Sequence, residues 1–118
     1  MDQVRWRNCQ QQHETYKKTQ DEAADLAGQT DPLEDLLHNI KASAQQRVDF
    51  CSLIVERIKV VQRLYMERSK YIELDCDRFD RFDKGTTAAQ RLAKHQGQLN
   101  NVDEQLKNLY TSKKRFCP

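Results

Sequence analysis

Residues 33–82 read LEDLLHNIKASAQQRVDFCSLIVERIKVVQRLYMERSKYIELDCDRFDRF, a stretch with neither glycine nor proline. Apolar or semi-apolar residues recur every seven positions from Leu37 to Phe79, and a companion series runs from Leu33 to Phe82. Two interleaved series of this kind form a seam with a period of 3.5 residues, which is typical of helices packed as a coiled coil. The stretch therefore predicts one long helix over 33–82, about 75 Å in length at 1.5 Å per residue.

A glycine and a proline mark the predicted start of this helix. Gly28 suits the position just after a helix end, and Pro32 suits the first turn of a new helix. Asp31 suits the N-cap between them, and Glu34 follows it at the spacing of a capping box. The segment predicts that a first helix ends at residue 27 and that the second begins at residue 33.

A second junction is predicted at Gly85, which suits a helix end. Thr87 and Gln90 follow it with the T-x-x-Q spacing of a capping box, so a third helix is expected to begin there. Leucines at 92, 99 and 106 give this third helix its own heptad stripe. The predicted fold is all-α, an elongated antiparallel three-helix coiled-coil bundle that forms a single domain over residues 1–118, with helices over 3–27, 33–82 and 87–115.

The composition agrees with a helical fold. The chain has 118 residues with only 3 Gly and 2 Pro, and so few turn-forming residues exclude a fold built from many short strands. Lys and Arg number 20 against 18 Asp and Glu, for a net charge of +2. Binding to nucleic acid without sequence preference depends on a basic excess, so it is not expected. The sequence predicts neither a membrane span nor a secretory signal, because it has no long apolar run.

Four cysteines occur at positions 9, 51, 76 and 117, without any CxxC pair. We interpret them as small buried hydrophobic residues in a reducing compartment, which indicates a cytoplasmic protein. A disulfide framework is the alternative interpretation.

The sequence offers no motif for catalysis or for binding a metal or cofactor. His13, His38 and His95 are far apart and form no HxxxH or HExxH pattern. The acid-rich segment 73–85 fails the ligand spacing of a calcium-binding EF-hand loop, and the scattered glycines form no phosphate-binding loop. We therefore expect no catalytic residue, no metal site and no cofactor, and the chain is not expected to be an enzyme.

Some apolar residues of the central helix lie off the seam, on an adjoining face. They are expected either to pack against a second helix or to form the interface with a protein partner or a second copy of the chain. The candidate interface residues are Phe50, Leu53, Val60 and Leu64.

Four polar residues fall at seam positions. Polar residues in a seam cost stability but can specify register and partner. The alternative is that their stems lie over the seam while their charged heads stay in water. The candidate residues for register and partner specificity are Arg47, Arg68, Asp75 and His95.

Residues 49–116 resemble the coiled-coil part of sorting-nexin-type BAR domains. The resemblance is carried by the segments DFCSL (49–53), LYMERSKY (64–71) and LKNLY (106–110). It implies a dimer with a curved, basic surface that binds endosomal membranes. The basic residues that could contact lipid are Lys113, Lys114 and Arg115. The chain also resembles the spectrin-type three-helix repeat in size and helix order, with Trp6 in the first helix.

The function expected from the sequence is that of a non-catalytic helical interaction module, a scaffold or subunit of a cytoplasmic complex. Because a slender monomer buries little apolar surface, a dimer or a larger assembly is expected. The alternative is a BAR-like dimeric protein attached peripherally to endomembranes.

Overall fold

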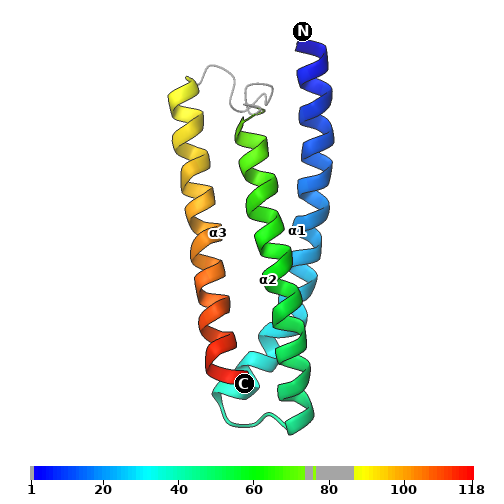
Figure 1. Cartoon of the computed structure of the whole chain (residues 1–118), viewed down its shortest axis with the longest axis vertical. Coiled ribbons are helices and arrows are strands. Elements are labelled where there is room, and N and C mark those ends of the chain that lie inside the picture. Colours follow the sequence, from blue (N-terminus) through cyan, green and yellow to red (C-terminus); the bar gives the residue numbers. More distant parts are fainter. Residues whose placement is uncertain (1, 74–75, 77–86) are drawn as a thin grey trace.

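The computed structural model of the chain describes residues 2–73, 76 and 87–118. Over these residues the chain forms the helices α1 (Asp2–His38), α2 (Ala44–Glu73) and α3 (Ala88–Phe116). The helices run side by side along a molecule of 56 × 23 × 21 Å, and α2 packs against both of the others (Figure 1). The prediction of an all-α, elongated three-helix bundle is confirmed.

The first helix does not end at Gly28. α1 continues through Gly28 and Pro32 to His38, so the junction predicted over 28–32 is wrong. Pro32 has no N–H for the carbonyl of Gly28, which normally kinks a helix. Figure 1 shows that the cyan part of α1 runs obliquely to its blue part. The continuation carries Leu37 into the core, where this side chain is buried.

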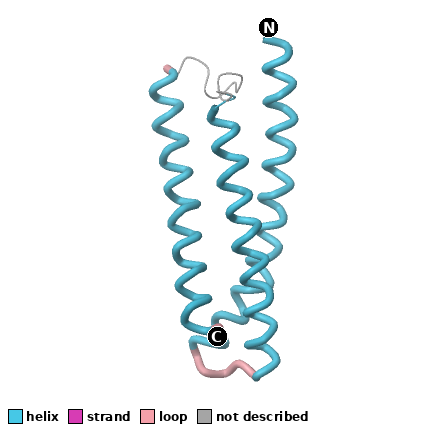
Figure 2. The backbone as a smooth tube through the Cα atoms, viewed as in Figure 1, coloured by secondary structure: helices cyan, strands magenta, loops and turns pink. Residues whose placement is uncertain are grey.

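The true junction between α1 and α2 lies at residues 39–43, the pink loop in Figure 2. The Ile40 N–H donates to the Leu37 carbonyl at 3.3 Å, and the Lys41 N–H donates to the Leu36 carbonyl at 2.8 Å. These two bonds define a Schellman motif, whose C′ residue adopts a left-handed conformation and is usually glycine. Here the C′ residue is Ile40, which has φ 54° and a side chain that is 94% exposed.

We expect Ile40→Gly to stabilise the protein by about 1 kcal/mol, because a β-branched residue is strained at positive φ and glycine is not. The loss of the isoleucine side chain costs little, since it is almost fully exposed. Urea denaturation followed by circular dichroism measures the effect. Ile40→Ala is the control: it removes the same exposed surface but still has a Cβ, so it should gain less. An Ile40→Gly variant no more stable than Ile40→Ala would contradict the argument.

Capping boxes begin both later helices. The Ser43 hydroxyl accepts from the Gln46 N–H at 3.1 Å, and the Gln46 side chain accepts from the Ser43 N–H at 2.8 Å. The second helix therefore begins at Ala44, not at residue 33. The predicted capping box of Thr87 and Gln90 is confirmed, and α3 continues through Gly97. The end of the second helix predicted at residue 82 and the junction predicted at Gly85 lie outside the described residues.

The core follows the predicted seam. Ile54, Ile58 and Val61 of α2 occupy seam positions and are buried. Together with residues of α1 and α3 they form one hydrophobic cluster, which consists of Leu37, Phe50, Ile54, Ile58, Val61, Leu109 and Phe116.

The cysteines are not free thiols, so our interpretation of them is wrong. Cys9 is bonded to Cys76 and Cys51 to Cys117, with Cα–Cα distances of 5.4 and 5.7 Å. The first disulfide links the start of α1 to the residues after α2, and the second links α2 to the end of α3. The sequence places three of the four cysteines in predicted helices, but it does not show which cysteines lie opposite each other in the fold.

Candidate functional site

A shallow groove lies between the last part of α1 and the first part of α2. Its volume is about 540 Å³. Pro32, Leu33 and Leu53 give it apolar surface, and the acidic side chain of Asp49 stands at its wall. Both helices therefore contribute to one concave surface, which is lined by Gln29, Pro32, Leu33, Asp49, Ser52 and Leu53.

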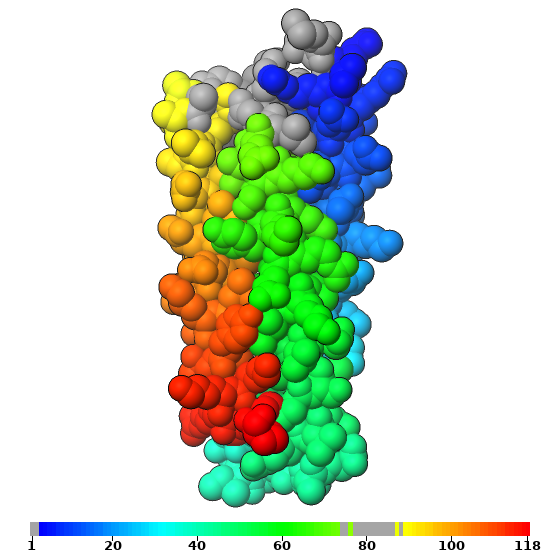
Figure 3. Space-filling model, in the orientation of Figure 1, coloured from blue at the N-terminus to red at the C-terminus, as the bar shows by residue number. Residues whose placement is uncertain are grey.

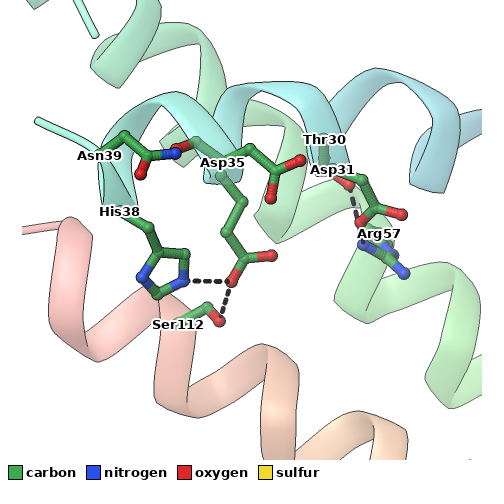
Figure 4. Close-up of polar contacts among 8 residues, drawn as sticks. Thr30, Asp31, Asp35, His38, Asn39, Arg57 and Ser112 are labelled. Atoms are coloured by element: carbon green, nitrogen blue, oxygen red, sulfur yellow. Dashed lines mark hydrogen bonds and ion pairs between the residues drawn. The ribbon is translucent and has the colours of Figure 1, made fainter. Parts of the chain in front are cut away.

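A buried arginine fixes the α1 wall of this groove. The Nη1 of Arg57 donates to Thr30 Oγ1 at 2.9 Å and to Asp31 Oδ1 at 2.8 Å (Figure 4). The Thr30 hydroxyl in turn donates to the Leu26 carbonyl at 2.9 Å. Thr30 is fully buried and Arg57 nearly so. This contact joins α1 to α2 immediately before Pro32, at the segment where the sequence predicted a helix break.

A second set of contacts fixes α1 just beyond the groove. The Ser112 hydroxyl of α3 donates to the carboxylate of Glu34, and His38 Nε2 lies 3.7 Å from the same carboxylate (Figure 4). The His38 ring also packs edge to face against Phe116, with centroids 4.8 Å apart. The last turns of α1 are thus held by α2 on one side of Pro32 and by α3 on the other. The groove is preformed, which lowers the entropic cost of binding a partner there.

The α2 wall is held by the second disulfide. Cys51 lies in the same helical turn as Asp49, Ser52 and Leu53, and its bond to Cys117 ties this turn to the end of α3. Asp49 also accepts a hydrogen bond from the Gln45 side chain at 2.8 Å. Because a carboxylate has about four acceptor sites, Asp49 can still accept from a cationic partner group.

Of the four candidate interface residues, only Leu53 lines this surface. Phe50, Val60 and Leu64 are buried within the chain, so the expectation that they form a face for a partner is wrong. They are off the seam because α2 packs against two helices rather than one. Leu53 is half-buried and contributes to the groove.

The structure brings together two of the four polar seam residues, Arg68 and His95. Arg68 Nη2 lies 2.6 Å from His95 Nδ1 and also donates to the Gln98 side chain. An arginine can only donate, so Nδ1 of His95 is the acceptor. The Arg68 guanidinium also lies 5.4 and 5.0 Å from the ring centroids of Tyr16 and Tyr71. Arg68 thus contacts all three helices, and its role in specifying register stays a prediction.

The other polar candidates lie apart from this cluster. Arg47 is exposed near the start of α2, and Asp75 lies outside the described residues. At the C-terminus, Lys114 and Arg115 are exposed and Lys113 is half-buried. The Arg115 guanidinium lies 5.2 Å from the centre of the Phe116 ring. Contact of these basic residues with lipid stays a prediction.

The groove residues Gln29, Pro32, Leu33, Asp49 and Ser52 were not among the sequence candidates. Pro32 was interpreted as a helix start, and this assignment separated it from the helix face that carries Gln29. The S-x-x-Q spacing at Ser43 and Gln46 is the signal that could have placed the junction correctly. With α1 extended to residue 38, Leu33 and Leu53 fall on neighbouring antiparallel helices.

Two further findings restrict the chemistry of the described residues. The described residues contain no group of three or more His, Cys, Asp or Glu side chains arranged to hold a metal ion. In the same part of the chain, no helix combines the length and apolar character needed to cross a membrane.

Comparisons of the chain with known protein families, with curated proteins and with solved structures found no match.

Proposed function

We propose that the chain is a non-catalytic helical module, held together by two internal disulfides, that binds a protein partner in the groove between α1 and α2. The observation that carries the proposal is the groove itself, with its apolar surface and with α1 held on both sides of Pro32. A concave apolar surface on rigid helices is suited to recognition of a helix by its side chains.

The residues that line the groove indicate what kind of partner it binds. The apolar surface of Pro32, Leu33 and Leu53 fits one or two apolar side chains of an amphipathic helix. Asp49 at the wall fits a lysine or arginine on the same helix, roughly one turn away. The proposed partner is therefore an amphipathic helix with an apolar stripe flanked by a basic residue.

The disulfides also bear on where this binding takes place. Structural disulfides form and persist in oxidising compartments and are rare in the cytosol. The expected cytoplasmic location rested on free thiols, which the structure does not have. We therefore propose that the module works in an oxidising compartment.

Leu53→Asp is expected to weaken partner binding by roughly tenfold to a hundredfold, since burying one leucine contributes about 1.5–3 kcal/mol. Partners cross-linked through a photoreactive residue at Ser52 are identified first. The affinity of the chain for a peptide from the cross-linked helix is then measured by calorimetry.

Two control variants test whether the groove is responsible. Val48→Asp places the same charge on the same helix, at an exposed residue outside the groove, and should bind like the wild type. Asp49→Lys should weaken binding of a basic helix but leave the fold intact. Equal binding by Leu53→Asp and the wild type would show that the groove is not the interface.

A further inference from the structure

We propose that the disulfide Cys51–Cys117 is a site of thiol–disulfide exchange with small anionic thiols, and that the attacked atom is Cys117 Sγ. The argument for this reactivity does not rest on partner binding in the groove, although the same bond ties the α2 wall of the groove to the end of α3. It rests on three features of the described residues: the different burial of the two disulfides, a recess at Cys117, and the charge of that recess.

The two disulfides differ in accessibility. Cys9 and Cys76 are only 5% and 2% exposed, so little of that bond is open to a thiol, although both residues border a pocket of about 260 Å³ beside Trp6 and Tyr71. Cys51 and Cys117 are both half-buried. Figure 3 shows the red C-terminal end of the chain at the surface, beside α2. Because exchange requires direct attack on a sulfur atom, the accessible disulfide reacts first.

Cys117 opens onto a recess that a small thiol can enter. The recess has a volume of about 420 Å³ and is lined by Tyr110, Lys113, Lys114, Cys117 and Pro118. Cys51 does not line it. Its sulfur lies 3.7 Å from the carbonyl oxygen of Phe116. Access therefore selects Cys117 as the attacked sulfur and Cys51 as the leaving group.

The recess carries positive charge from Lys113 and Lys114. A cationic surface concentrates anionic reactants. The recess is therefore expected to favour a thiol that carries carboxylates over one that carries an ammonium group.

The exchange balances as two displacements. The incoming thiolate forms a bond to Cys117 Sγ, the Cys51–Cys117 bond breaks, and Cys51 leaves as a thiolate that takes up a proton. A second thiolate attacks the mixed disulfide at the sulfur of the small molecule, which leaves as the oxidised dimer and releases the Cys117 thiolate. Two small thiols are oxidised and one protein disulfide gains two electrons.

The experiment compares glutathione, an anionic thiol, with cysteamine, a cationic one, on the folded full-length chain at equal thiolate concentrations. Samples are quenched with acid and alkylated, and peptide mass spectrometry gives the initial cleavage rate of each disulfide. We expect Cys51–Cys117 to be cleaved at least about tenfold faster than Cys9–Cys76. We also expect the first adduct on Cys117 and a preference for glutathione that added salt reduces.

Charge variants test whether the preference for glutathione comes from the lysines of the recess or from surface charge in general. Lys113→Gln with Lys114→Gln should lower the glutathione rate several-fold while leaving the cysteamine rate unchanged or higher. Lys107→Gln is the matched control, an exposed lysine on the same helix outside the recess, and should behave like the wild type. Equal initial cleavage of both disulfides, a first adduct on Cys51, or a glutathione preference that survives the double substitution would each overturn the proposal.

Discussion

Replacing all four cysteines by alanine is expected to abolish the stable three-helix fold. The disulfides join residues that are 67 and 66 positions apart in the sequence. Closing a loop of that size removes chain entropy from the unfolded state that corresponds to about 4 kcal/mol of stability. Small domains have a free energy of unfolding of roughly 5–15 kcal/mol in total. Losing both cross-links therefore removes most or all of the stability of this chain.

The two contributions are not fully additive. The loops overlap between Cys51 and Cys76, so the second cross-link closes a chain that the first has already shortened. Each double variant, Cys9→Ala with Cys76→Ala or Cys51→Ala with Cys117→Ala, is therefore expected to fold with a lowered urea midpoint. The quadruple variant should lose most of its helical circular dichroism without denaturant. A quadruple variant with the midpoint of the wild type would contradict the structural role of the disulfides.

The heptad pattern predicts the helices and their core because it is a local property of the chain. Ile54 and Val61 were placed on the seam by their spacing, and both are fully or almost fully buried. The capping box at Thr87 was also recognisable, because its bonds join residues three positions apart. These features depend on the backbone geometry of one helix, so the sequence is sufficient to locate them.

The junction at Gly28 and Pro32 was mispredicted because the local signals there are overridden by contacts between helices. Glycine and proline in a helix interior cost about 1 and 3 kcal/mol. The hydrogen bonds of Arg57 to Thr30 and Asp31 and the burial of Leu37 offset this cost. Arg57 lies 27 residues beyond Thr30 in the sequence. The heptad pattern does not show that two residues so far apart are in contact.

The partner face was mispredicted because the sequence does not show which face of α2 the first helix covers. α1 runs antiparallel to α2, as shown by the contacts Arg63–Glu22 at 3.1 Å and Gln12 to the Glu67 carbonyl at 3.1 Å. Val60 and Leu64 lie on the part of α2 that α1 covers. Whether an off-seam residue meets a neighbouring helix or solvent depends on how that helix is placed against α2, which no local pattern shows. The pairing of the cysteines depends on the same non-local arrangement.

Phe50→Ala is expected to destabilise the protein by about 3–5 kcal/mol, the usual cost of truncating a buried phenylalanine. Phe50 is 0% exposed and packs edge to face against Phe116, with ring centroids 6.0 Å apart. Its removal leaves a cavity in the cluster where α1, α2 and α3 meet. Urea denaturation followed by circular dichroism measures the loss.

The matched control is Val48→Ala, two residues away on the same helix. Val48 is 61% exposed, so its truncation should change the free energy of unfolding by no more than about 0.5 kcal/mol. Leu53→Asp should lie between the two, because Leu53 is half-buried and keeps part of its surface in the groove. If Phe50→Ala were no more damaging than Val48→Ala, Phe50 would not be a core residue. The off-seam face of α2 would then be open to a partner, as the sequence alone suggested.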